Sequence, residues 1–489
     1  MKLIYQVEDK PKFSQLIVFA LQQLLAIMTA TLVVPVIING NVAAAIAKKE
    51  IEWQMTKPMS PAAALFGAGV GTLIYLFFTK RKSPVFLGSS FAFLGSLTSA
   101  FTGAATMALG YLGLILGAFI AGLVYVIISF VVKLRGTGWI EKLMPAVVIG
   151  PTVAIIGLAL AVNAVGDLTT AIKANALTGT VATDPKIALL CGLVTLAVVM
   201  ISSVYGKKSG KLIPFIYGIL AGYVFALIVS HCGYMLKIPE MYIIPENAWD
   251  GFLVDGSVTF KSFISMPEFS FLNASGAFGD LNPTYFLTIL VAYAPVAFVV
   301  FAEHIADHKN ISSIIERDLL KDPGLDKTLL GDGVGSMVGA FFGGCPNTTY
   351  GESIGCVAIT KNASVVTIFA AAIGAILISF FNPFIVFINS IPSCVMGGVC
   401  MALYGFIAVS GLKMIQQVDL NKNKNLFVVS VILISGVGGL EVSFNTSNGV
   451  ITITKVACAL ILGILTNLIL KNAPDEEVTE EKTEKKAKK

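Results

Sequence analysis

Three carboxylates and a histidine lie within or beside apolar stretches of this sequence, where ionisable side chains are rare. Glu303 and Asp307 are four residues apart in the run that begins at Tyr285, so a helix there places both on one face. His304 follows Glu303 directly, and Glu352 lies in a later apolar segment. Two carboxylates that face one cavity repel each other, so one of them tends to hold a proton. We therefore interpret Glu303, His304 and Asp307 as a candidate proton-coupling group.

The surroundings leave a structural interpretation open for some of these residues. Asp307 and His308 precede a lysine and could be the polar end of a helix that enters a loop. Glu303 lies deeper, directly after an apolar run, and a carboxylate at membrane depth usually has a functional task. Asp332 lies between two glycines, and it could support the site or only hydrogen-bond backbone between packed helices.

Two short, interrupted apolar segments supply a second kind of binding group. Segment 85–101 contains a Gly-Ser-Ser break at 88–90, and segment 347–359 begins with Asn-Thr-Thr-Tyr-Gly. A half-helix that begins at mid-membrane leaves backbone N–H groups without partners, and these carry a partial positive field. Such groups would donate hydrogen bonds to a ligand at the gap.

Aromatic residues accompany both breaks. Phe91 follows the first break and Tyr350 precedes Gly351 at the second, so their rings would flank a flat ligand. Glu352 would accept a hydrogen bond from a ring N–H. A single aromatic residue beside a glycine more often packs in the core, but its repetition at two matching breaks favours a binding site for a planar base.

The composition places these residues in a membrane protein. The 489 residues are 56% hydrophobic and only 13% charged, and the mean hydropathy is +0.83. A soluble chain of this length would need more charge to cover its surface. With roughly 18–20 apolar residues per span, we predict an all-α integral membrane protein with about fourteen transmembrane helices. The seven cysteines show no metal-ligand spacing, and we expect neither a metal nor another cofactor.

The expected spans divide the chain into two halves. Residues 1–235 would hold spans one to seven, 236–283 an extracytoplasmic loop, 284–471 spans eight to fourteen, and 472–489 a charged tail. The interrupted segments are the third span of each half, and halves with an odd number of spans must have opposite orientations. Matching broken spans in two inverted repeats indicate a transporter site at the bilayer midplane.

The distribution of Lys and Arg predicts the orientation. Basic residues precede the first expected span and follow the second, fourth, sixth, eighth, tenth and twelfth. By the positive-inside rule, both termini are cytoplasmic in a multi-pass protein of the cell membrane. The exceptions are Lys48, Lys49 and Lys57 in the first opposite loop. The net charge of +5 says little about nucleic acid in such a chain, and we expect no nucleic-acid partner.

The motifs resemble those of the nucleobase–ascorbate transporter, or uracil–xanthine permease, family, and most closely its bacterial uracil permease branch. The resemblance extends from about residue 13 to 470. It rests on the following segments: Pro346-Asn347-Thr348-Thr349-Tyr350-Gly351-Glu352, Ala302-Glu303-His304, Leu87-Gly88-Ser89-Ser90-Phe91-Ala92-Phe93, Asp318 to Leu325, and Pro392 to Gly398.

This resemblance implies fourteen spans in two inverted repeats, with short antiparallel strands in spans three and ten. It also implies a core domain of about 13–132 plus 284–381 and a gate domain of about 137–233 plus 384–470. Elevator-like movement, proton symport and homodimers are further implications. By position, Glu303 and Glu352 would hold the base, Phe91 and Tyr350 would flank it, and the Gly351 amide would donate to it.

The sequence departs from the family pattern at several positions. Gln23 stands where many members have His, and Ser353, which we count among the substrate-binding residues, replaces the usual Asn after the signature acid. Asp307 matches the purine branch, since the uracil branch has His there, whereas Glu352 matches the uracil branch. We expect the supporting residues to be Gln23, Asp332, Ser89 and Ser90.

Three other functions are alternatives to this one. A membrane enzyme would need a nucleophile, metal cluster or cofactor motif, and none is found in the sequence. A channel or a bicarbonate or sulfate transporter of related architecture would favour a cationic site, whereas the candidate groups here are acidic. A xanthine or other purine permease of the same family stays the main alternative to uptake of uracil with protons.

Overall fold

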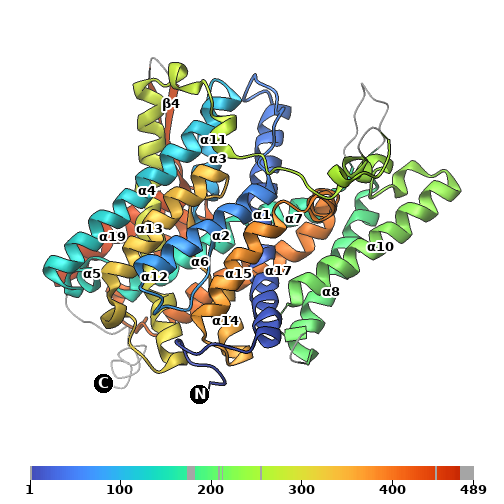
Figure 1. The fold of residues 1–489 in the computed structure, drawn as a ribbon. Helices are drawn as coiled ribbons and strands as arrows, with labels where there is room; N and C mark the ends of the chain where they lie inside the picture. Colours follow the sequence, from blue (N-terminus) through green and yellow to red (C-terminus); the bar gives the residue numbers. More distant parts are fainter. Residues whose placement is uncertain are drawn as a thin grey trace, which may run out of the picture.

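The computed structural model describes residues 3–172, 182–207, 210–211, 213–253, 256–446 and 449–473, and most of them are helical (Figure 1). In the described part of the chain, nine helical stretches are long and apolar enough to cross a membrane. They are Phe13–Ala47, Pro61–Phe78, Met107–Arg135, Ala146–Leu168, Pro185–Tyr205, Pro214–Leu236, Pro283–Ile315, Ser393–Ile415 and Lys455–Asn472.

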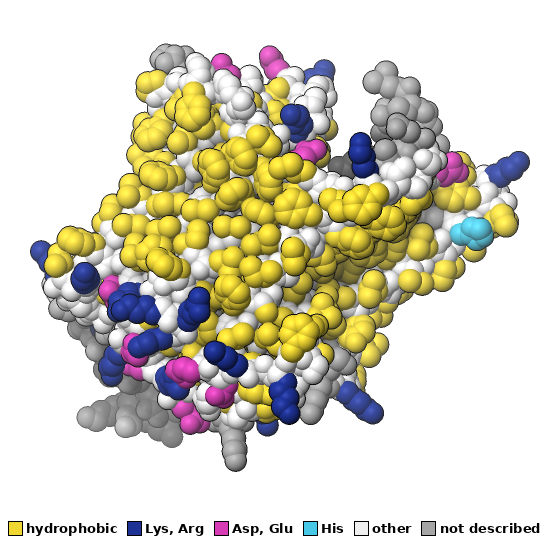
Figure 2. Space-filling model, in the orientation of Figure 1, with side chains coloured by type: hydrophobic (Ala, Val, Ile, Leu, Met, Phe, Trp, Pro, Cys, Tyr) yellow, Lys and Arg dark blue, Asp and Glu magenta, His cyan; other side chains and the backbone are white. Residues whose placement is uncertain are grey.

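Large apolar side chains cover the outside of the molecule, as lipid contact requires. On α4 (Met107–Arg135), Phe119, Ile127 and Phe130 are 53%, 55% and 62% exposed. Figure 2 shows hydrophobic side chains in a broad band across one face, with Lys and Arg gathered below it. Such a continuous apolar surface is typical of a membrane protein. The chain is therefore a multi-pass membrane protein, as predicted.

The remaining elements complete the first half of the chain. Helices α1 (Phe13–Ala47) and α2 (Pro61–Phe78) precede strand β1 (Leu87–Ser89) and helix α3 (Leu94–Thr102). After α4, the elements are α5 (Gly138–Leu143), α6 (Ala146–Ala159), α7 (Ala161–Leu168), α8 (Pro185–Tyr205) and α10 (Pro214–Leu236).

The second half follows the short helix α11 (Ser270–Asn273) in the connecting loop. Its elements are α12 (Pro283–Ile315), α13 (Leu325–Phe342), β2 (Asn347–Thr349), α14 (Gly351–Thr360), α15 (Val365–Ile378), α16 (Asn382–Asn389), α17 (Ser393–Ile415), α18 (Asn423–Val437), β3 (Val442–Thr446), β4 (Gly449–Ile453) and α19 (Lys455–Ile469). The antiparallel hairpin β3–β4 was not predicted.

Helix α12 is longer than expected, and this corrects one interpretation of the sequence. It continues beyond Asp307 to Ile315, and the His308 side chain is fully buried. Asp307 and His308 are therefore not the polar end of a helix. The segment after 307 is more polar than a lipid-facing span, and it packs against protein through His308, Ile311 and Ile315.

Strands β1 and β2 join the two interrupted segments, as the family resemblance implied. They are antiparallel, with Leu87 opposite Thr349 and Ser89 opposite Asn347. The Tyr350 hydroxyl donates a hydrogen bond of 2.8 Å to the Ser89 carbonyl. The Tyr350 ring lies where a Cβ on Gly88 would be, so only glycine fits there. Irregular backbone at this depth is tolerated because protein surrounds it.

Glycines allow α13 to pack closely against α2 and α4. A Cβ on Gly71 would lie 2.8 Å from the Gly335 carbonyl oxygen, and one on Gly333 would lie 2.9 Å from the Gly122 carbonyl oxygen. Small residues let membrane helices approach until their backbones touch. These contacts hold α13, which directly precedes β2 and α14 in the chain, against α2 and α4.

The N-terminal segment holds the far end of α14. Ile4 N–H donates to the Lys361 carbonyl at 2.8 Å, and Ala363 N–H donates to the Tyr5 carbonyl at 3.0 Å. Glu8 forms an ion pair with Arg317, and the hydrogen bond from this guanidinium holds the pKa of Glu8 below its usual value. Figure 1 shows the N-terminus beside α14.

Helix packing forms two groups. In the first, α2 packs against α13 and α15, and α4 against α12 and α13. In the second, α17 packs against α6, α7 and α8, and α10 against α8. Figure 1 shows α8 and α10 at one side of the molecule and α4, α12 and α13 at the other.

Candidate functional site

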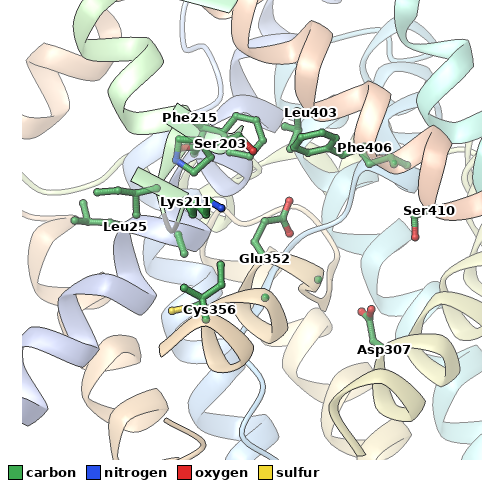
Figure 3. Close-up of a pocket in the computed structure, with 18 of the residues that line it drawn as sticks. Leu25, Ser203, Lys211, Phe215, Asp307, Glu352, Cys356, Leu403, Phe406 and Ser410 are labelled. Carbon is green, nitrogen blue, oxygen red and sulfur yellow. The ribbon is translucent and has the colours of Figure 1, made fainter. Parts of the chain in front are cut away.

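A cavity of about 360 Å³ brings together the acidic residues singled out in the sequence. Glu303 and Asp307 of α12 and Glu352 of α14 all line it, and Figure 3 shows the Asp307 and Glu352 carboxylates directed into it. The two α12 carboxylates share one helical face because they are one turn apart. Lys211 is the one lysine or arginine among the described residues that line this cavity. The site is therefore predominantly acidic.

The opposite wall of the cavity is mostly apolar and comes from other helices. Leu25 belongs to α1, Phe215 to α10, and Leu403 and Phe406 to α17 (Figure 3). Ser410 adds a hydroxyl from α17. Sequence reasoning missed these residues, because an aromatic residue in an apolar helix gives no signal of the space it faces. An apolar cavity with a few polar groups is typical of a small-molecule site.

The N-terminus of α14 opens into the cavity. Gly351 is its first residue and lines the cavity, and a Cβ built there would have no heavy atom within 4 Å. The first N–H groups of a helix lack intrahelical partners and carry partial positive charge. A helix that begins here places its first N–H groups beside the Glu352 carboxylate.

Thr349 contacts Asp307 from the end of β2. Its Oγ1 donates a hydrogen bond of 2.7 Å to Asp307 Oδ2. This bond joins α12 to the strand that precedes α14. The sequence offered no sign of this pairing, because the two residues belong to segments whose relative depth the sequence does not define.

His304 lies on the side of α12 that faces away from the cavity. Its Nδ1 is 2.7 Å from Asp332 Oδ2, and its Nε2 is 3.0 Å from Thr328 Oγ1. His304 and Asp332 are both fully buried. The structure thus brings these two predicted residues together, but neither lines the cavity.

His308 extends the same buried polar cluster. Its ring stacks on that of His304 at 4.0 Å between centroids. Its Nδ1 is 2.8 Å from the His304 carbonyl, which can only accept, so Nδ1 carries the proton. Its Nε2 lies 2.7 Å from the Tyr75 hydroxyl, which is also 2.7 Å from Ser83 Oγ. Sequence reasoning missed Tyr75 and Thr328, since tyrosine and threonine are common in apolar helices.

The predicted aromatic pair lies beside the cavity rather than in its wall. Tyr350 is buried and hydrogen-bonded to Ser89, as described above. Phe91 is half-buried, and its ring meets that of Tyr404 edge-on at 5.9 Å between centroids. The hydroxyls of Ser89 and Ser90 are buried and hydrogen-bond no described group.

Gln23 of α1 is hydrogen-bonded to Ser353, the residue after Glu352 in α14. Gln23 Nε2 donates to Ser353 Oγ and, at 3.3 Å, to the Ser353 carbonyl oxygen. The Phe86 N–H also donates to Ser353 Oγ, at 3.0 Å. Ser353 is fully buried and does not line the cavity. The pair that departs from the family pattern thus ties α1 to α14.

Comparison with known proteins gives the family. A family model described as "Permease family" matches residues 14–445. The chain is 36% identical over 474 residues to the uracil permease of Bacillus subtilis (strain 168), covering 96% of each. It is 35% identical over 467 residues to the uracil permease of Escherichia coli (strain K12), covering 95% of this chain and 93% of that one.

Solved structures share the fold at low sequence identity. The transmembrane domain of the cyanobacterial bicarbonate transporter BicA has a TM-score of 0.53 and 14% identity, over 94% of this chain and 99% of that chain. The murine anion transporter Slc26a9, in the inward-facing state, has a TM-score of 0.59 and 11% identity, over 95% of this chain and 69% of that chain. The fold is therefore that of a membrane transporter.

The family matches confirm the resemblance drawn from the motifs and the expectation that the chain is not an enzyme. This chain belongs to the permease family that includes the bacterial uracil permeases.

Proposed function

We propose that this permease takes up uracil with protons across the cell membrane. The observation that carries the proposal is the convergence of three carboxylates and the open N-terminus of α14 on one cavity. The names of its relatives support the same substrate. Uracil presents two ring N–H groups and two carbonyl oxygens on one flat ring, and this site offers matching acceptors and donors.

The proposed binding mode assigns one task to each group. Glu303 and Glu352 accept hydrogen bonds from the ring N–H groups, and the Gly351 N–H donates to a ring carbonyl. Charge-assisted hydrogen bonds of this kind are stronger than neutral ones. Tyr350 holds strand β1 through the Ser89 carbonyl, and the apolar wall of Phe215 and Phe406 excludes water from the ring faces.

In this proposal, the coupled proton is carried by a carboxylate of the same cavity. Glu303 and Asp307 are one turn apart, and the Glu352 carboxylate adds a third negative charge beside them. Crowded carboxylates in a poorly solvated site favour retention of a proton. We assign that proton to Asp307, with Glu303 as the alternative carrier. His304 has its hydrogen bonds on the other face of α12.

The proposed movement is an elevator-like displacement of a core domain, about 13–132 plus 284–381, against a gate domain, about 137–233 plus 384–470. The two helix groups support this division, because each packs mainly within itself. The carboxylates come from the first group and the apolar wall mainly from the second. Inverted seven-helix repeats, cytoplasmic termini and a homodimer are part of the same proposal, on the basis of the charge pattern and the family resemblance.

Uptake assays test the substrate. Cells that lack their own nucleobase permeases are supplied with the gene and labelled uracil or labelled xanthine. We expect saturable uracil uptake that excess unlabelled uracil blocks and that a protonophore abolishes. Uptake of xanthine alone would contradict the uracil assignment and favour the purine alternative, which Asp307 supports by its match to the purine branch.

A further inference from the structure

Thr349 occupies a position between the carboxylate proposed to carry the proton and the backbone proposed to bind the base. Its side chain is 1% exposed and does not line the cavity. Its Oγ1 donates to Asp307 at 2.7 Å, and among the described residues Thr349 is the one side chain that hydrogen-bonds this carboxylate. Two residues later, Gly351 begins α14.

The pairing of β1 with β2 couples the position of Thr349 to the N-terminus of α14. Thr349 pairs with Leu87 in the β1–β2 register, and the next residue, Tyr350, hydrogen-bonds the Ser89 carbonyl. A residue this tightly held cannot move without moving its neighbours. Displacement of Thr349 would therefore shift the first turn of α14, which carries Gly351 and Glu352.

The strength of the Thr349 bond depends on the proton of Asp307. An ionised carboxylate is a stronger acceptor for a hydroxyl than a protonated one. Glu303 of α12 and Glu352 of α14 face the same cavity, Lys211 lies on its wall, and Asp332 lies behind α12. These groups influence how readily Asp307 is protonated, but none of them is bonded to Thr349 in the described structure.

We infer that Thr349 is a positioning residue through which the protonation of Asp307 changes the affinity of the α14 N-terminus for the transported base. This inference rests on the proposed function. The proton on Asp307 weakens the hydrogen bond from Thr349. Because this bond holds strand β2, its loss would shift the first turn of α14, where the base is proposed to bind.

The experiment measures uracil affinity of the purified full-length protein in detergent, by calorimetry, across the pH range in which carboxylates and histidine titrate. We expect the affinity of the wild type to change severalfold with pH. Thr349→Val keeps the shape and removes the donor, so its affinity should vary less than twofold. Thr349→Ser restores the donor and should restore the pH dependence, and Thr349→Cys, a weaker donor, should fall between them.

Thr348 provides a matched control on the same strand. Its hydroxyl is buried and hydrogen-bonds no described group, so Thr348→Val should keep the pH dependence of the wild type. Asp307→Asn should abolish the pH dependence, and Thr349→Val should add no further change in that background. Should Thr349→Val fail to fold, the ranking of the Ser and Cys variants against wild type still decides the matter.

The outcomes separate this inference from the proposed function. Wild-type-like pH dependence in Thr349→Val, or equal loss in Thr348→Val, would overturn the role of Thr349 while uracil transport stands. Binding of uracil by the wild type with no pH dependence would do the same. Absence of uracil binding at every pH would instead overturn the proposed function, and this inference with it.

Discussion

His304 Nδ1 lies 2.7 Å from Asp332 Oδ2, on the side of α12 that faces away from the cavity. The same helix presents Glu303 and Asp307 to the cavity. Adjacent residues of α12 therefore have different surroundings. The carboxylates face the cavity, and the imidazoles pack against α13 and α2. This arrangement leads us to expect separate consequences when each side is altered.

Asp332→Asn should destabilise the protein without uncoupling transport. The substitution leaves His304 buried beside a neutral partner, and breaking a buried polar pair costs about 3–5 kcal/mol. The melting temperature in detergent should fall clearly, whereas the accumulation ratio of protein that still folds should match wild type. Asp318→Asn is a suitable control because Asp318 is half-exposed beside Lys321. Normal stability together with lost proton coupling would instead place the coupled proton at Asp332.

Glu303→Gln should lower uracil uptake at least about tenfold at unchanged abundance in the membrane. The amide keeps the shape of the side chain and removes the charge that accepts a ring N–H. Loss of one charge-assisted hydrogen bond in a buried site costs about 1.5–3 kcal/mol. Initial uptake rates, normalised to protein in the membrane, check this. Uptake close to that of the wild type would remove Glu303 from the site.

Asp307→Asn should uncouple transport from the pH gradient more than it weakens binding. An asparagine cannot take up a proton, so substrate should equilibrate without accumulating. The measurement is accumulation in proteoliposomes with and without an ionophore that dissipates the gradient. Full gradient-driven accumulation by the variant would assign the proton elsewhere, with Glu303 the next candidate.

Glu352→Gln should change specificity as well as affinity. A carboxylate accepts hydrogen bonds, whereas an amide both accepts and donates, which suits the additional acceptor nitrogen of a purine. We expect most uracil uptake to be lost and weak xanthine binding to be gained, because unmatched polar groups in a buried site discriminate strongly. Competition by unlabelled bases checks this. If xanthine blocks wild-type uptake at lower concentration than uracil does, the purine assignment is correct.

Gly88→Ala should disrupt the strand pair. The added Cβ would occupy the position of the Tyr350 ring, and overpacking of this kind costs about 1–3 kcal/mol. We expect a lower melting temperature and loss of uracil binding. Gly40→Ala is the control, since a Cβ there meets no atom within 4 Å. Equal behaviour of the two variants would show that the Tyr350–Gly88 contact is dispensable.

Much of this site could be predicted from the sequence because its signals are local. A carboxylate after an apolar run, such as Glu303, is unusual in any membrane span, and the Gly-rich breaks mark where helices cannot continue. The motif from Pro346 to Glu352 then indicated the family to which these features belong. These features depend on residue type and order, which the sequence contains directly.

The remaining features depend on how helices are rotated and how deeply they pack. Hydropathy could not show that α12 continues to Ile315, because its last turns are polar and only partly buried. Helical spacing places His304 about 100° round α12 from Glu303, but it does not say which neighbour each side chain meets. The cavity residues Phe215 and Phe406 were missed for the same reason.

The pairing of β1 with β2 also determines when during biosynthesis the site can exist. β1 emerges from the ribosome with the first half of the chain, and β2 emerges only after the long connecting loop and α12. Until then, the unpaired backbone of the first interrupted segment has no strand partner, so the nascent first half is incomplete rather than an independent domain. Assembly in the membrane and creation of the binding site are therefore one event, completed when the second half inserts.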